Sequence, residues 1–194
     1  MDHTNKPART TGPATRTQAG SAVVHTVGSD PLLENEQLIY KRHLTSHKYI
    51  ADQSTKKEKT LDERVTRGPP LEEREALRIV YQIAEGLAAI HRSGVEHMNI
   101  TAMNILLIGE NNDVKICNFT EAKFTGDSYK DTDMKDLSIM MGKLYKRPRE
   151  RPQPISKWIE LCREGKTAKE VSEAFKQMME ALEKSELERR EKNH

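Results

Sequence analysis

The chain has 194 residues, of which 35% are hydrophobic and 32% are charged, and its 32 basic and 30 acidic side chains give a formal net charge of +2. This length suits one domain, and the near balance of charge gives no argument for nucleic acid or an anionic membrane as a partner. No run of about 18 apolar residues occurs, so no membrane span is expected. Residues 1–20 lack the apolar core of a signal peptide. Cys117 and Cys162 form neither a metal-binding pattern nor a disulfide framework. We therefore expect a cytoplasmic or nuclear protein.

The first third of the chain carries weak structural signals. Residues 1–30 have almost no large apolar side chains, so they cannot bury enough surface to offset the entropy of ordering, and a disordered tail is expected. Short apolar stretches at 32–33 and 37–40 flank the polar residues 34–36, a pattern that suggests a small hairpin. The segment 44–60 is interpreted as flexible, and 61–65 as a short helix.

An amphipathic helix is the strongest predicted element. Apolar residues three, four and one positions apart form a single stripe: Ala76, Ile79, Val80, Ile83, Leu87 and Ile90. Prolines at 69–70 precede the stripe and Gly94 follows it, which are start and stop signals for a helix. Apolar runs at 105–108 and 114–116 then flank a Gly-, Asn- and Asp-rich segment, 109–113, which is typical of a β-hairpin.

Three more helices are expected after the hairpin. Their apolar stripes are Leu137, Met140, Met141, Leu144 and Tyr145 in the first, Ile155, Trp158, Ile159 and Cys162 in the second, and Val171, Phe175, Met178 and Leu182 in the third. The nearly all-charged stretch 183–194 is interpreted as the solvated end of the last helix, with a partner-docking coil as the alternative.

The order of helix, loop, hairpin and the Asn-Phe-Thr segment 118–120 resembles the catalytic core of the eukaryotic protein kinase superfamily. In that family a helix ending in Leu-x-x-x-His is followed by the catalytic loop H-R-D-[LI]-K-x-x-N, a hairpin and D-F-G. Here Leu87 and His91 stand at the helix end, and the loop 97–104 reads HMNITAMN. The resemblance also makes Asp133 the aspartate that fixes the catalytic-loop backbone, while a plain helix N-cap is the simpler interpretation.

The resemblance implies a fold and a division of the chain. The fold is mainly α (α+β): a protein-kinase-like C-lobe of packed helices with a small β-hairpin, the N-lobe being largely absent. We expect a tail at 1–30, a partly flexible remnant of the N-lobe and hinge at 31–70, the C-lobe at 71–182 and a charged helix end at 183–194. Neither G-x-G-x-x-G nor Val-Ala-x-Lys occurs, so the phosphate-covering loop and the lysine are missing, and the glutamate that pairs with that lysine has no place.

Most of the residues that carry kinase chemistry differ from the family pattern. The catalytic aspartate falls on Asn99, whose neutral amide cannot serve as a base. The Mg²⁺-binding aspartate falls on Asn118, a much weaker ligand. The loop arginine and lysine fall on Met98 and Thr101, and the D-F-G glycine falls on the threonine of 118–120. Of the metal-coordinating positions only Asn104 is retained.

These departures predict a catalytically inactive pseudokinase that binds an unidentified protein partner or acts as a scaffold, without a cofactor. His97, Asn99 and Asn104 are degenerate catalytic-loop positions with no active role expected, and Asn104 and Asn118 are vestigial metal ligands. For Asn104, bracing of the loop by side-chain hydrogen bonds is weighed equally with residual metal binding. His91 and His97 are expected to bind backbone groups rather than a metal ion. Two alternatives stay open: an ATP-binding protein or weak Ser/Thr-type kinase that uses ATP and Mg²⁺, and a truncated gene product without a kinase-related role.

Overall fold

The fold was obtained as a computed structural model, which describes residues 31–44, 47–51, 55, 59–126, 132–145 and 153–192. The expected tail at 1–30 lies outside these residues. The elements in chain order are α1 (Pro31–His43), β1 (Lys59–Thr60), α2 (Leu61–Arg67), α3 (Glu73–Arg92), β2 (Val95–Glu96), the 3₁₀ turn η1 (Ala102–Asn104), β3 (Ile105–Ile108), β4 (Asp113–Ile116), β5 (Lys123–Phe124), α4 (Thr132–Leu144), α5 (Gln153–Arg163) and α6 (Ala168–Lys192). Helices dominate and the strands are short, as expected from the sequence.

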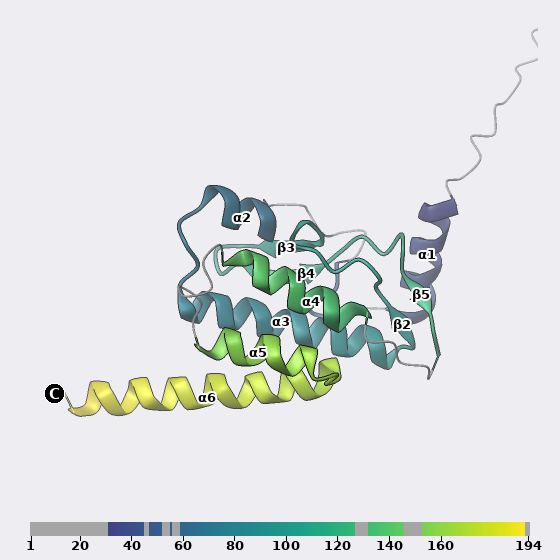
Figure 1. Ribbon diagram of the computed structural model, residues 1–194. Coiled ribbons are helices and arrows are strands. Elements are labelled where there is room, and N and C mark those ends of the chain that lie inside the picture. Colours follow the sequence, from purple (N-terminus) through teal and green to yellow (C-terminus); the bar gives the residue numbers. More distant parts are fainter. Residues whose placement is uncertain are drawn as a thin grey trace, which may run out of the picture.

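Helix α3 is the centre of the molecule. Figure 1 shows α6 along one side of α3 and the hairpin strands β3 and β4 on the other, and α3 contacts both α6 and β4. Every residue of the predicted α3 stripe is at most 1% exposed. The helix ends at Arg92, and Gly94 follows with φ of +70°, a conformation that glycine adopts without steric cost.

The predicted hairpin forms, and α3 holds it through a buried polar residue. Strand β3 pairs antiparallel with β4, and β1 adds a third strand on the far side of β3. On α3, the Gln82 side chain accepts from the Val114 amide at 2.7 Å and donates to Asp113 Oδ1 at 3.1 Å. Because Gln82 is 5% exposed, these bonds satisfy an amide that would otherwise be costly to bury. Asp113 belongs to β4 rather than to the turn.

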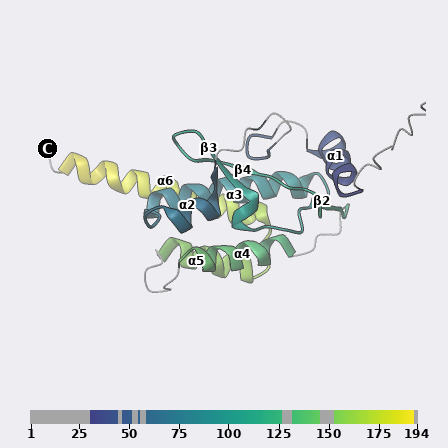
Figure 2. The same cartoon turned by 90° about the horizontal axis from the view of Figure 1, so that it is seen from above.

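Helix α1 replaces the hairpin that we expected around residues 34–36, so that prediction is wrong. Pro31 is the first residue of α1 and Glu34 lies in the first turn, a favourable start because proline lacks the amide proton that a first helical residue leaves unused. Residues 34–36 contain no glycine or proline to support a tight turn. Figures 1 and 2 both place α1 at one end of the molecule, near β2.

The helices that follow the hairpin form as predicted. Figure 2 shows α4 and α5 side by side, and α5 also contacts α3 and α6. The predicted stripe of α5 is buried, and Trp158 packs edge-on against Phe175 of α6 at a centroid distance of 5.6 Å. In α6, Met178 and Leu182 are only half-buried, because the helix runs out along the surface. Within the described residues, no helix is both long enough and apolar enough to cross a membrane.

Candidate functional site at the catalytic-loop segment

Asp133 fixes the segment that follows α3. Its Oδ2 accepts from the backbone amide of His97 at 2.9 Å and from His91 Nε2 at 2.8 Å, and its Oδ1 accepts from the backbone amide of Met98 at 2.8 Å. Asp133 is fully buried. Burial alone raises the pKa of this carboxyl, but the hydrogen bonds from His91 and the His97 amide outweigh it and lower the pKa overall. The expected tie to the loop backbone is therefore present, and Asp133 lies inside the first turn of α4 rather than at an N-cap.

His97 is a buried, neutral support of the loop. Its Nε2 lies 3.0 Å from the Cys117 carbonyl oxygen, and its Nδ1 accepts from the Asn99 amide at 3.3 Å. Only a neutral ring with its proton on Nε2 satisfies both contacts. Burial lowers the pKa of His97, in agreement with this tautomer. The ring also packs against Phe119 at a centroid distance of 4.7 Å.

The positions that carry kinase chemistry form a chain of amide hydrogen bonds. Asn104 Nδ2 donates to the Asn99 carbonyl at 2.8 Å, and Asn118 Nδ2 donates to Asn104 Oδ1 at 3.1 Å. The Thr120 hydroxyl donates to Asn118 Oδ1 at 2.7 Å, and Asn99 Nδ2 donates to Glu121 Oε1 at 3.1 Å. The structure thus brings Asn99, Asn104 and Asn118 together, and the amide oxygens of Asn104 and Asn118 both accept internal hydrogen bonds.

The backbone is left-handed at two points of this site. Met98 and Asn118 each have φ of 66°. Asparagine visits this region readily, whereas methionine does so at a steric cost. The hydrogen bond from the Met98 amide to Asp133 holds the unfavourable conformation in place.

Sequence reasoning missed three residues that contact the site. From α1, Glu36 Oε1 accepts from the Phe119 amide at 3.0 Å, and Asn35 Nδ2 donates to the Thr120 and Ala122 carbonyls at 3.1 and 3.0 Å. The third is Glu121. Helix α1 therefore brings a glutamate to the Asn-Phe-Thr segment, where it binds a backbone amide. Pro31 at the helix start was the available signal.

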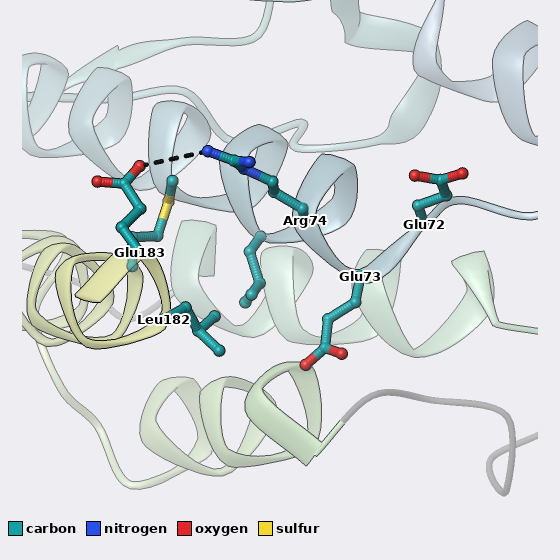
Figure 3. A pocket seen from close by; sticks show the side chains of 7 residues that line it. Glu72, Glu73, Arg74, Leu182 and Glu183 are labelled. Carbon is teal, nitrogen blue, oxygen red and sulfur yellow. Dashed lines mark ion pairs between the residues drawn. The ribbon is translucent and has the colours of Figure 1, made fainter. Parts of the chain in front are cut away.

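One cavity adjoins this site, and a second cavity lies away from it. A groove of about 630 Å³ runs between α2, the loop 98–102 and α4. A smaller pocket of about 240 Å³ lies between the start of α3 and α6, away from the loop. Figure 3 shows this pocket, where Arg74 pairs with Glu183 at 3.7 Å beside Leu182. In the described part of the chain, no group of three or more His, Cys, Asp and Glu side chains could hold a metal ion.

Comparison with known proteins agrees with this geometry. The family model of the protein kinase domain matches residues 36–149. The chain is 39% identical to "Putative cyclin-dependent kinase F-2" of Oryza sativa subsp. japonica over 59 residues. This matched stretch is 30% of this chain and 18% of that protein. It is 47% identical to mitogen-activated protein kinase mpkC of Emericella nidulans over 60 residues, a stretch that is 31% of this chain and 14% of that protein. A third relative, mitogen-activated protein kinase HOG1 of Exserohilum turcicum, is 44% identical over 54 residues, which are 28% of this chain and 16% of that protein.

The fold, the Asp133-anchored loop and the matched domain together define the class of protein. The chain belongs to the protein kinase family. Its similarity to these relatives spans less than a fifth of the length of each.

Proposed function

We propose that this chain is a catalytically inactive member of the kinase family, a pseudokinase that acts by binding another protein, in the cytoplasm or nucleus. The observation that carries the proposal is the set of hydrogen-bonded asparagines at the site, Asn99, Asn104 and Asn118. Asn99 and Asn118 stand where the family uses carboxylates, and an amide supplies neither the basicity for a hydroxyl proton nor the negative charge that Mg²⁺ prefers.

The side chains at the metal-binding positions, Asn104 and Asn118, fit ATP with Mg²⁺ poorly. The amide oxygens of Asn104 and Asn118 accept from Asn118 and from Thr120 at 3.1 and 2.7 Å. A metal ion would have to displace these hydrogen bonds and would gain only neutral ligands. These amides therefore give no support for phosphoryl transfer, and the proposed function needs no cofactor.

Glu121 is the one feature that favours weak kinase activity as a second candidate. Its exposed carboxylate lies 3.1 Å from Asn99 Nδ2, close to where the family places its catalytic base. A carboxylate there could accept a proton from a hydroxyl group. Because one base without metal ligands leaves the phosphoryl charge without its usual stabilisation, we rank this candidate below the pseudokinase.

The test is a thermal shift measurement with ATP and Mg²⁺, together with transfer of labelled phosphate to a generic protein substrate. We expect neither a shift nor transfer, whereas a ligand at about a hundredfold excess over its Kd stabilises a protein by about 2.7 kcal/mol. An active kinase assayed in parallel is the positive control.

Labelled product from this chain would contradict the proposal if it disappears in Asn104→Ala. Loss of the product in Glu121→Gln as well would then identify Glu121 as the base of a weak kinase. A thermal shift without transfer would support the ATP-binding alternative, and Asn118→Ala would show whether the nucleotide occupies this site.

A further inference from the structure

The last turns of α6 project from the body of the molecule. Figures 1 and 2 both show this end of the helix extending past the start of α3. The ion pair between Arg74 and Glu183 marks the place where α6 leaves the body, and at about 1.5 Å per residue the stretch 184–192 then adds about 14 Å. Every residue from 187 to 192 is exposed. Because a helix end of this length is only marginally stable in water, packing against another surface would stabilise it.

An acidic collar surrounds the base of this projection. The collar consists of Glu72 and Glu73 at the start of α3 and Glu183 of α6, and Figure 3 shows all three around one pocket. Arg74 is the only cation among the residues that line this pocket, and its pairing with Glu183 is solvent-exposed and weak. Within the described residues, no ion pair involves Glu72 or Glu73. The collar therefore attracts cations.

A basic tip and an exposed leucine complete the projection. The basic tip, residues 189–192, reads Arg-Arg-Glu-Lys. Leu187 is the one large apolar residue of the stretch 184–192, and its side chain is 58% exposed. Measured along the helix axis, Leu187 stands about 6 Å from Glu183 and about 7.5 Å from Lys192. It therefore lies close to midway between the acidic collar and the basic tip.

We propose that the projecting ends of two copies of this chain pair side by side in opposite directions and form a symmetric dimer. A two-fold axis near Leu187 brings each basic tip to the acidic collar of the other copy, because tip and collar lie at nearly equal distances on either side of that residue. The two Leu187 side chains then meet at the axis. Such a pairing is self-complementary, as a two-fold interface requires. With a net charge of +2, the two copies repel each other little.

Sedimentation velocity of the full chain tests for the dimer. The projecting ends are short, so the interface is smaller than the roughly 1,200–2,000 Å² of a stable complex, and the dimer should be weak and reversible. The weight-average sedimentation coefficient should therefore rise between about 10 and about 500 µM protein. Leu187→Ser should weaken association by about tenfold, because it removes the apolar contact at the axis. Leu187 is exposed, so this variant should keep the wild-type melting temperature.

Charge reversal tests the contact between tip and collar. The tip variant Arg189→Glu/Lys192→Glu should associate at least about tenfold more weakly, because like charges then face each other. The collar variant Glu72→Lys/Glu73→Lys should be weakened for the same reason. An equimolar mixture of the two variants should recover a dimer, since both of its contacts join opposite charges again. Added salt should weaken the wild-type dimer.

Each charge variant has a control with the same change in net charge at exposed positions of α5 and of the start of α6. Lys157→Glu/Lys169→Glu matches the tip variant. Glu160→Lys/Glu173→Lys matches the collar variant. Both controls should associate as the wild type does, because the replaced side chains lie outside the projection.

A cysteine at the axis gives a reading that does not depend on weakening the dimer. Under mild oxidation Leu187→Cys should form a disulfide between two copies, because a residue near a two-fold axis lies close to its own counterpart. Lys157→Cys, at an exposed position of α5, should crosslink at least about tenfold more slowly, since only random collisions bring two such residues together. Non-reducing electrophoresis over time measures both rates.

The dimer proposal is overturned by any of four results: a sedimentation coefficient that is constant over the concentration range, unchanged association in Leu187→Ser, no recovery in the mixture, or crosslinking of Leu187→Cys no faster than that of Lys157→Cys. A chain that stays monomeric would leave the projection to a different protein or to solvent. The dimer does not rest on the proposed function. Phosphate transfer by a dimeric chain would refute the pseudokinase and leave the dimer intact, whereas a monomer without transfer refutes the dimer alone.

Discussion

At the residue scale, the site keeps the supports of a kinase catalytic loop while its chemical groups are amides. Asp133 accepts three hydrogen bonds from the loop and from the end of α3. His97 supports the loop with a neutral ring that contacts the Cys117 carbonyl and the Asn99 amide. The Asn104 side-chain amide donates to the Asn99 carbonyl oxygen and so braces the loop. This is the structural role that we weighed equally with metal binding when interpreting the sequence. These contacts stabilise geometry without requiring catalysis.

The neutral state of His97 predicts a stability that depends on pH. Burial holds the pKa of His97 in the folded chain below 6.5, the ordinary value of a histidine. As the pH falls below that value, the unfolded state takes up a proton that the folded state resists, so the free energy of unfolding decreases. The slope is at most about 1.4 kcal/mol per pH unit for this group. Urea denaturation between about pH 7.5 and about pH 5 measures it.

The variant His97→Gln should be less stable at every pH but should show a shallower slope in this window. His47→Gln is the matched control, because burial also lowers the pKa of the half-buried His47, and most of the slope should remain. The lowered pKa of Asp133 does not interfere, since its contribution to stability is lost only below its unfolded value of 3.8. An unchanged slope in His97→Gln would assign the pH dependence to another group.

At the element scale, α1 and the hairpin are both held by side chains that reach distant backbone. Gln82 of α3 binds the start of β4, and α1 binds the segment 119–122 through Asn35 and Glu36. These partners are 31 to 87 positions apart in the chain. Apart from the bond between the Gln82 and Asp113 side chains, each of these bonds gives a backbone group its partner and so orders the segment that carries it.

The contact from Glu36 predicts local protection of the Asn-Phe-Thr segment. In Glu36→Ala the Phe119 amide loses the carboxylate that accepts its hydrogen bond at 3.0 Å, so its hydrogen exchange should accelerate, and the chain should lose about 1–3 kcal/mol of stability. Hydrogen–deuterium exchange read by mass spectrometry on the peptide around residues 118–122 measures this effect. Gln37→Ala, at the exposed neighbouring position, should leave exchange unchanged. Equal exchange in both variants would mean that α1 does not stabilise the segment.

At the scale of the whole molecule, one hydrophobic core joins elements from α1 to α6. It includes Ile39 of α1, the α3 stripe, the hairpin and the closing helices. The largest fully buried side chain is Trp158, which packs against Phe175. Because this contact joins α5 to α6 beside α3, it links the end of the chain to its centre.

Replacing that tryptophan should therefore destabilise the whole fold. Trp158→Ala should cost about 3–5 kcal/mol in the free energy of unfolding, because a large cavity remains among the helices. Trp158→Phe should cost less, and Lys157→Ala, at the exposed adjacent position, about 0.5 kcal/mol or less. Denaturant unfolding monitored by circular dichroism measures all three. A near-zero change in Trp158→Ala would show that α5 is not part of the cooperative core.

The sequence by itself determined the elements with a strong local period and the family to which they belong. The α3 stripe, the turn at 109–112 and the stripes of α4 and α5 are patterns within a few residues, and local geometry converts such patterns into helices and hairpins. The order of these elements and the spacing from the loop 97–104 through the hairpin to the segment 118–120 then sufficed to indicate a kinase-like core.

Only the tertiary structure decided the rest. Residues 31–43 form a helix whose side chains bind a segment more than 80 positions away, and no local pattern records such a partner. The pairing of β2 with β5, two residues each, depends on where α3 ends and the chain returns. The groove exists because α2, the loop and α4 meet in space. Contacts between distant segments depend on packing, and packing depends on all the elements at once.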